Sequence, residues 1–451
     1  MTILKSIRLL SNRIPLLFTV ITVIHIFYIF SSGNLTGIEL ESGIVSSYNH
    51  IKSQNTRKYN LNGEYGLWVQ ERNNQIVVNW ITQEPDSGYL KVFNNDNLHY
   101  DFTTPVSRSH SIAFEKLNYE SLVLQYGSLK NDFDKHVTTI YLNFSEHERN
   151  YIFNKVDSIY VIGDVHGEYN NLLQLLTNGK IIDSNLKWIA NRKHLVFLGD
   201  IFDRGHDVTK TLWFLYHLEK QAKKYGGYVH VVLGNHEIMT LCNDLRYLSG
   251  KENLIAKLHN IEYSKMFDIQ HSILGKWLAA KPGILRINNI LFAHGGVTPD
   301  YIKYFNDSIE SFNDSLYAYL HADLFKYLLA DSLTIASLSL TKVDSLQITR
   351  MLYFLFAEKS VFWHRGYVLT DTLKSDLEKV LKKFKSKLHV VAHTALKTIQ
   401  EFYDGKIIGV DLRRPATEML LLARKKKKKY DKIRYKINGI SETLRKIQDN
   451  Q

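Results

Sequence analysis

The sequence is poor in cysteine and in proline. Cys242 is the only cysteine among 451 residues, which excludes an intrachain disulfide framework and any zinc module built from several thiolates. Six prolines stand beside 27 tyrosines, an imbalance that indicates biased composition rather than a mechanism. With 45% hydrophobic and 23% charged residues the chain has a globular composition, and its length suggests two or three domains.

Acidic residues are few at the C-terminal end, where the positive charge is concentrated. Eleven Lys or Arg follow Ala423 against three acidic residues, so residues 424–451 contribute +8 of the net charge of +12. The basicity therefore belongs to this segment and not to a nucleic-acid-binding face. We interpret residues 424–451 as a basic tail that is solvated or disordered, with contact to anionic lipid or a polyanion as the alternative.

The N-terminus carries a long uncharged apolar run. Three basic residues precede the run, which extends from Ile14 to Phe30, and small residues follow it. This order predicts a signal peptide or an N-terminal membrane anchor over residues 1–33, followed by a linker over residues 34–60. Because the positive charges precede the run, we expect the rest of the chain to be exported, either periplasmic or membrane-anchored outside the cytoplasm.

The rest of the chain divides into two regions with different sequence patterns. Residues 61–150 read as short strands separated by turns, as in "QIVVNWIT" (Gln75 to Thr82), and predict a small all-β sandwich. Residues 151–423 alternate strands with helices and predict an α/β layered domain. A helical stretch near residues 308–357 interrupts the alternation and is expected to cover one edge.

Polar loops follow five of the predicted strands in residues 151–423. The loops read "GDVHG", "GDIFDRG", "GNHE", "AHGG" and "VAHT", and they offer Asp164, His166, Asp200, Asp203, Arg204, Asn235, His236, His294 and His393. In open α/β sheets ligands bind beyond the carboxyl ends of the strands, so these loops are expected to converge on one site. A single histidine is more often a packed core residue, but five such loops are hard to explain as turns.

The residue types fit a pair of divalent metal ions. Carboxylate, imidazole and amide ligands without thiolate suit Mn, Fe, Zn or Co. We expect Asp200 to bridge the two ions, which would leave Asp164 and His166 on one of them. The second ion would then be held by Asn235, His294 and His393. Such a site keeps a small positive charge and attracts a phosphate dianion.

This ordered set of loops resembles the signature of calcineurin-like metallophosphoesterases, in the phosphoprotein phosphatase branch. It is most similar to the Shewanella-like protein phosphatases, since "GDIFDRG" and "WHRGY" are present and a C-terminal "SAPNYC" is absent. The resemblance implies a layered β-sandwich flanked by helices over residues 151–423. It departs from the pattern at Ala392, where a glycine is usual before the last histidine.

The same resemblance implies roles for residues around the metals. His236 would be the general acid, oriented by Asp203. Arg204 would clamp the phosphate together with Arg365 of "FWHRGY", and Glu237 would anchor its loop. The front domain resembles the fibronectin-III-like domain ahead of purple acid phosphatase catalytic domains, and an unrelated spacer is the alternative.

The function that follows is a binuclear metal-dependent phosphatase. We expect direct attack of metal-bound hydroxide on phosphate monoesters, in phosphoproteins modified on Tyr or Ser/Thr or in small molecules. A phosphodiesterase or nucleotide pyrophosphohydrolase using the same site is one alternative, and a membrane-tethered binding protein is another. Expected partners are the phosphorylated substrate and a membrane, reached through the N-terminal segment and the basic tail; nucleic acid is not expected.

Overall fold

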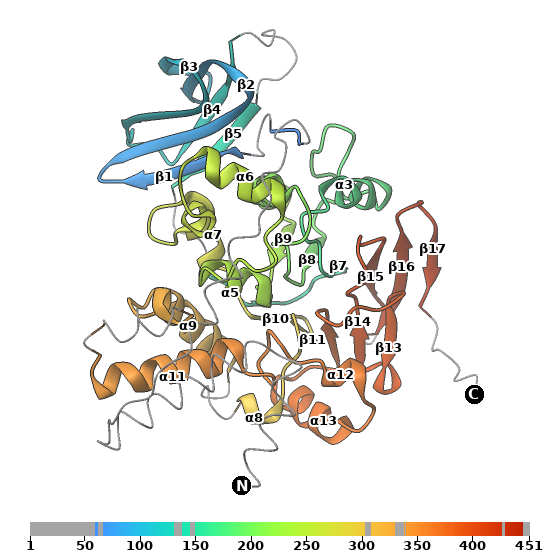
Figure 1. Cartoon of the computed structure of the whole chain (residues 1–451). Coiled ribbons are helices and arrows are strands. Elements are labelled where there is room, and N and C mark those ends of the chain that lie inside the picture. The colour runs from blue at the N-terminus through green and yellow to red at the C-terminus, as the bar shows by residue number, and fades with distance from the viewer. Residues whose placement is uncertain are drawn as a thin grey trace.

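The computed structural model describes residues 59–61, 66–129, 138–144, 149–302, 308–329, 338, 340–425 and 429–444 (Figure 1). The predicted N-terminal anchor and almost all of the predicted linker lie outside these residues. Within the described part of the chain, no helix combines the length and the apolar character needed to cross a membrane.

The N-terminal residues form one antiparallel sheet of five strands. Its strands are β1 (Trp68–Arg72), β2 (Gln75–Asn94), β3 (Asn97–Glu115), β4 (Ser121–Ser128) and β5 (Thr138–Asn143). In β2 the side chains of Ile76, Val78 and Trp80 are buried on one face, and those of Asn79 and Ile81 on the other face are buried too. Asn73 and Asn74 both have positive φ, which suits the two-residue turn between β1 and β2.

The N-terminal region is all-β as predicted, and two of its strands are unusually long. The long strand β2 continues through "EPDSG" (Glu84 to Gly88), with shifts in its register against β3 between Ile81 and Tyr89. Such bulges bend a strand without ending it. As a result β3 pairs with the whole of β2, and hydrogen bonds connect all five strands.

Two further sheets of six strands each make up the rest of the β-structure. The β7 sheet contains, in spatial order, β17 (Ser441–Thr443), β16 (Tyr430–Lys436), β15 (Glu418–Arg424), β7 (Ser158–Ile162), β8 (His194–Phe197) and β9 (Tyr228–Val231). The β11 sheet contains β13 (Gln400–Phe402), β14 (Ile407–Gly409), β12 (Leu388–Val391), β11 (Ile290–Ala293), β10 (Ile284–Ile287) and β6 (Ile152–Phe153).

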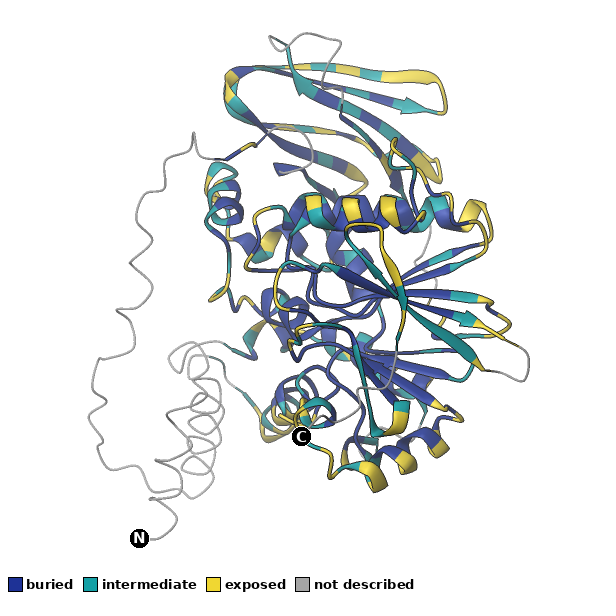
Figure 2. Ribbon diagram, turned by 90° about the vertical axis from the view of Figure 1, so that its right-hand side faces the viewer, coloured by how far each residue is buried: buried dark blue, intermediate teal, exposed yellow. Residues whose placement is uncertain are grey.

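The β7 and β11 sheets pack face to face. Alternate residues of each strand point into a shared apolar layer, for example Val161 of β7, Val196 of β8 and Phe292 of β11. The intervening residues, such as Phe197, point to the outer face of the β7 sheet and join a second core. This period of two is that of strands buried on both faces. Figure 2 shows the buried interior in dark blue between the exposed outer surfaces.

Helices cover the outer faces of the sandwich. They are α3 (Tyr169–Asn178), α4 (Val208–Lys224), α5 (Asn235–Leu241), α6 (Gly250–Leu258), α7 (Ile273–Ala279), α8 (Pro299–Ile302), α9 (Ile309–Leu320), α11 (Lys342–Phe356), α12 (Gly366–Leu369) and α13 (Lys374–Lys383), with the 3-10 helices η4 (Tyr263–Phe267), η5 (Phe325–Tyr327) and η6 (Tyr403–Gly405). Apolar residues of α3 and α4 pack on the β7 sheet, and those of α12 and α13 pack on the β11 sheet. The layered β-sandwich flanked by helices is therefore the architecture of this part of the chain, and α9 and α11 lie in the stretch predicted to be helical.

The predicted C-terminal boundary at residue 423 is wrong. β16 pairs with β15 along its whole length, and β17 pairs with β16, so the described part of the predicted basic tail extends the β7 sheet. Arg434 and Lys436 of β16 form ion pairs with Glu442. Lys432 of β16 pairs with Glu401. These acidic partners neutralise the basic side chains on one face of β16. The other face carries Ile433 and apolar neighbours, so β16 can pack as a strand of the sheet.

Candidate metal centre

The five predicted loops meet at one end of the sandwich, beyond the carboxyl ends of β7, β8, β9, β11 and β12. Their close approach depends on glycine. A Cβ on Gly163 would lie 2.5 Å from the carbonyl oxygen of Val410, and one on Gly199 would lie 2.5 Å from the backbone nitrogen of Gly234. The glycines thus let loops from both sheets touch, and the polar side chains of the loops are brought into one buried cluster.

The backbone at this cluster is strained. Five of the predicted site residues have positive φ, namely His166, Asp200, Asp203, Arg204 and His393. Each such conformation is unfavourable for a residue with a side chain and persists only where the surroundings enforce it. Strain concentrated in this way is typical of a functional site, because it aims side chains at a common point instead of optimising the local chain.

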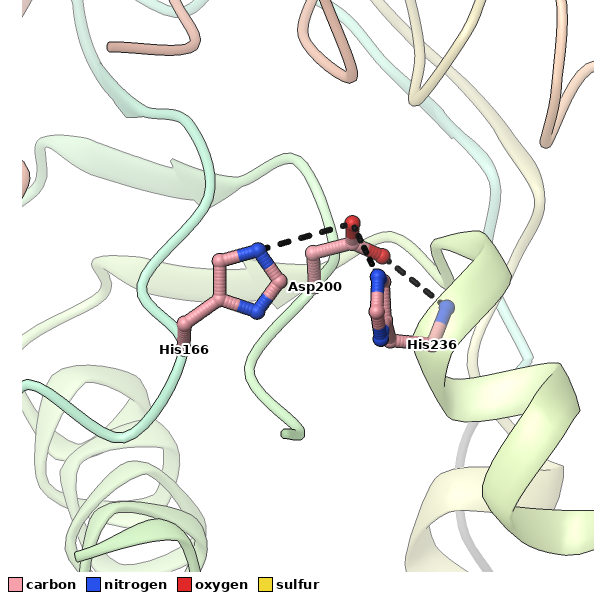
Figure 3. A group of neighbouring side chains, drawn as sticks. All are labelled: His166, Asp200 and His236. Carbon is pink, nitrogen blue, oxygen red and sulfur yellow. Dashed lines mark hydrogen bonds and ion pairs between the residues drawn. The ribbon is translucent and has the colours of Figure 1, made fainter. Parts of the chain in front are cut away.

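Asp200 lies between two imidazoles in the first half of the cluster (Figure 3). Its Oδ2 atom is 3.9 Å from Nε2 of His166 and 3.8 Å from Nε2 of His236. His166 hydrogen-bonds the carbonyl oxygen of Phe202 through Nδ1 at 2.7 Å. That contact fixes the ring and leaves Nε2 facing Asp200, as a metal-ligating histidine requires.

The other half of the cluster shares the same carboxylate. Oδ1 of Asp200 lies 3.3 Å from Nε2 of His294, which is 3.0 Å from Oδ1 of Asn235 and 3.2 Å from Nδ1 of His393. His294 is oriented from outside by the carbonyl oxygen of Leu198. Asp200 therefore touches both groups, and both groups have the composition of a cation site. A carboxylate in this place is positioned to bridge two ions.

Asp164 lies beside the first group, with Oδ2 3.8 Å from Nε2 of His166. It accepts a hydrogen bond from the backbone of His393 at 3.3 Å, which links the two sheets. Asp411 is a second buried carboxylate, and its charge raises the pKa of Asp164. The sequence analysis did not identify Asp411 as a site residue. The available signal was its position, since Asp411 follows β14 just as the other site residues follow their strands.

His236 is held as a general acid would be. Its Nδ1 atom lies 2.5 Å from Oδ2 of Asp203, and Nε2 faces the cluster. The following residue, Glu237, is fully buried and accepts hydrogen bonds from four backbone amides, those of Asp200, Ile201, Phe202 and Gly234. Glu237 thus anchors two loops, as predicted, and is not free to act as a base.

Two arginines border the cluster where it opens to solvent. Arg204 contacts Nε2 of His166 at 2.6 Å and Nε2 of His236 at 3.1 Å. Arg365 donates to the carbonyl oxygen of His393 at 2.5 Å, which fixes its guanidinium at the other side. Tyr247, which the sequence analysis did not single out, lies with its ring centroid 5.3 Å from that of His236 and is 46% exposed.

The electrostatics of the cluster favour bound cations. Burial, with Asp411 and Asp200 nearby, raises the pKa of Asp164 well above its usual range. Burial and Asp200 raise the pKa of Asp411 to about 7. Burial lowers the pKa of His166 to about 3, so this ring is neutral, which is the form in which an imidazole binds a metal. Nε2 of His393 is buried and has no hydrogen-bond partner among the described residues, and together these observations show that the donor set fits divalent ions.

A β-sandwich with this donor set at its strand ends defines a metallophosphoesterase, a class of metal-dependent hydrolases that use two divalent ions. The chain belongs to the calcineurin-like phosphoesterase family, whose sequence pattern matches residues 158–397, more than half of the 451 residues. The predicted family is therefore confirmed.

Individual relatives agree with the predicted branch. The Shewanella-like protein phosphatase 1 of Plasmodium berghei is 34% identical over 152 residues, 32% of this chain and 42% of that protein. An asymmetrical bis(5'-nucleosyl)-tetraphosphatase of Oceanobacillus iheyensis is 31% identical over 154 residues, 32% of this chain and 57% of that protein. The matches thus span less than two thirds of either relative.

A solved structure covers much more of the chain. The cold-active protein-tyrosine phosphatase of a psychrophilic Shewanella species has a TM-score of 0.64 and 29% identity, covering 84% of this chain and 98% of its own. Because residues 151–451 make up only two thirds of this chain, such a match extends into the N-terminal all-β region. The two proteins are therefore similar beyond the catalytic sandwich.

Proposed function

We propose that the protein is a phosphatase that hydrolyses phosphate monoesters, with phosphoproteins as its substrates. The observation that carries the proposal is the completeness of the site. Two groups of candidate ligands share Asp200, and one of them includes His236; Asp203 holds His236 through Nδ1, and two arginines border the opening. A binding protein without catalysis would not need an oriented acid and a phosphate clamp in addition to metal ligands.

The residues of the site have separate roles in phosphoryl transfer. Asp164, His166, Asp200, Asn235, His294 and His393 would hold the metal ions, which would supply positive charge and make a water molecule more acidic and hence a better nucleophile. Arg204 and Arg365 bind two oxygens of the phosphate and hold the phosphorus atom in line between the attacking water and the departing oxygen. His236 gives its Nε2 proton to the departing oxygen, and Asp203 stabilises the ring in that charged form.

The leaving group is expected on the side of His236, where Tyr247 lies. The exposed ring of Tyr247 is 5.7 Å from the guanidinium carbon of Arg204 and is available to an aromatic group. This favours aryl esters such as phosphotyrosine over alkyl esters. The similarity to a structure titled as a protein-tyrosine phosphatase supports the same choice.

A second candidate function uses the same site but cleaves a different bond. The similarity to a bis(5'-nucleosyl)-tetraphosphatase favours a nucleotide pyrophosphohydrolase, since the same metals and arginines would serve a phosphoanhydride. A phosphodiesterase is the related possibility. The proposal further includes export by the N-terminal segment, as a signal peptide or an anchor, and a fibronectin-III-like role for residues 61–150 in docking substrate. Those two parts rest on sequence patterns.

The decisive experiment compares substrate classes on defined metals. Metal-stripped protein is reloaded with Mn, Fe, Zn or Co one at a time, and phosphate release is measured from phosphotyrosine and phosphoserine peptides, a dinucleoside tetraphosphate and a phosphodiester. Asp200→Asn serves as the inactive control because it loses the shared ligand. Metal-restored release from the peptides is expected. Cleavage of the tetraphosphate or the diester alone would replace the proposal by the second candidate.

A further inference from the structure

The end of the sandwich opposite the catalytic loops is strongly basic. The parallel strands begin at this end, and the β10–β11 and β15–β16 hairpins turn there, at the right of Figure 2. The described segments at this end are residues 154–157, 191–193, 224–227, 288–289, 384–387, 403–406, 424–425 and 429. They contain ten Lys or Arg against two Asp. We call this surface the basic face.

Hydrogen bonds tie these segments into one surface. The backbone nitrogen of Arg424 donates to the carbonyl oxygen of Asp157 at 2.7 Å. The backbone nitrogen of Lys387 donates to the backbone carbonyl oxygen of Asn289 at 2.8 Å. Asn289 in turn contacts the hydroxyl of Tyr430 at 3.2 Å. The cations therefore belong to both sheets of the sandwich and lie on a continuous, rigid base.

Most of these cations lack an acidic partner. Seven of them are exposed and form no ion pair with the described residues: Lys155, Arg192, Lys224, Lys385, Lys387, Arg424 and Lys429. Strand β16 starts at this end, and cations further along it do have acidic partners. Lys432 forms an ion pair with Glu401, and Arg434 forms one with Glu442. The excess of cations over carboxylates is thus a property of this end and not of the chain's composition.

An exposed aromatic side chain stands among the cations. Tyr225 follows Lys224 and is 58% exposed. The next residue, Gly226, is close to Arg192, whose Cγ would lie 3.6 Å from a Cβ at that position. A tyrosine beside lysine and arginine is the combination found at membrane–water interfaces, where the ring enters the headgroup layer.

We propose that the basic face docks the protein on a membrane that contains anionic phospholipid. The charge is complementary to such a surface and extends across the ends of two sheets, as a planar partner requires. The catalytic loops are at the other end, so a docked protein keeps its active site open. The apolar run Ile14 to Phe30 in the sequence would bring the chain to a bilayer. A duplex nucleic acid is less suited, because its specific readers place a helix or a ribbon in a groove and this face consists of strand ends.

The test measures sedimentation of the full chain with phosphatidylcholine vesicles, with and without phosphatidylglycerol. Wild type is expected to bind the anionic vesicles more tightly, and less so as salt is raised. The variant K155Q/K387Q/R424Q is expected to lower the partition coefficient by about two orders of magnitude, since each cation near the surface contributes about fivefold. The control K257Q/K265Q/K342Q changes three exposed lysines on α6, η4 and α11 and should bind as wild type does.

Equal binding of the basic-face variant and wild type would overturn the proposal, as would equal binding to both kinds of vesicle. Retention of duplex DNA without binding to vesicles would replace it by a nucleic-acid partner. The substituted side chains form no ion pairs with any part of the chain that the structure describes, so the thermal unfolding temperature should stay unchanged. If the triple variant unfolds, the three single substitutions carry the test at about fivefold each. The outcome is independent of the proposed phosphatase activity, because no catalytic residue is altered.

Discussion

His236 and Asp203 form the contact on which the chemistry most depends at the scale of single residues. The imidazole is buried, its Nδ1 atom is held by a carboxylate whose other oxygen has no hydrogen-bond partner, and Nε2 faces the cluster. Burial raises the pKa of Asp203, although the hydrogen bond to His236 opposes this. The contact therefore fixes the orientation of the imidazole, with Nε2 directed to the place where a leaving oxygen would depart.

We expect His236→Ala to lower kcat on phosphoserine peptides by roughly 10²–10⁴. The loss should be much smaller on 4-nitrophenyl phosphate, because this leaving group departs without a proton. Steady-state kinetics on both substrates checks the prediction, with Asp203→Asn expected to show part of the same pattern. An equal loss on both substrates would mean that His236 acts through binding or folding instead.

Glu252 connects two helices at the scale of elements. It is fully buried on α6 and accepts hydrogen bonds from the backbone and the hydroxyl of Thr209 at the start of α4, at 3.1 and 2.6 Å. Burial raises its pKa to about 7, against an ordinary value of 4.5. The folded state therefore holds this proton more tightly than the unfolded state does, and stability present below pH 4.5 is lost as the pH rises to 7.

Glu252→Gln should remove this dependence on pH. We expect the variant to gain about 3 kcal/mol over wild type between pH 4.5 and 7, measured as the difference in urea unfolding of the metal-loaded proteins. Glu120→Gln, which changes an exposed carboxyl, serves as the control and should follow wild type at every pH. A constant difference between Glu252→Gln and wild type would show that the pKa of this carboxyl is the same in the folded and unfolded states.

The C-terminal strands are the second feature decided at the scale of elements. β16 covers the edge of β15, and Ile433 and Tyr435 pack against the core outside the β7 sheet. A chain that ends at residue 424 exposes this edge and its apolar face, so we expect it to be insoluble on expression. A chain that ends at residue 444 keeps every described strand and should be soluble with an unchanged unfolding temperature. Solubility of the shorter chain would contradict the assignment of β16 to the fold.

The candidate metal centre connects the two sheets at the scale of the whole molecule. Its candidate ligands come from loops after strands of both sheets, and Asp164 and Asp411 are buried carboxyl groups at their junction. Ions that bind the folded chain and not the unfolded one stabilise it by about 2.7 kcal/mol at a concentration 100 times Kd. Metal occupancy therefore affects the stability of the whole sandwich and not only the reaction.

We expect chelation to lower the thermal unfolding temperature by roughly 5 °C, and addition of Mn to restore it. Differential scanning calorimetry measures the shift, with Asp200→Asn as a variant that should respond to neither treatment. A chelated protein that unfolds at the same temperature as the loaded one would show that the centre does not hold metal under these conditions.

The loops that carry the chemistry could be predicted from the sequence because they combine several local signals. Strongly apolar strands, glycines and polar residues follow each other in "GDVHG", "GDIFDRG" and "GNHE", and strand ends converge in any layered α/β fold. The alternation of strands with helices predicted the layered sandwich for the same reason. These features depend on neighbours within a few residues of one another.

Other features depend on contacts between distant residues, and only the tertiary structure decided them. The charges of β16 are neutralised by Glu401 and Glu442, so a count of net charge could not identify a strand. Asp411 carries no motif and joins the site because β14 lies next to β12. The basic face is assembled from eight separate segments, none of which is complete alone. The sequence by itself determined which side chains are present and which strands they follow; packing determined which of them share one environment, because burial and electrostatics act through space.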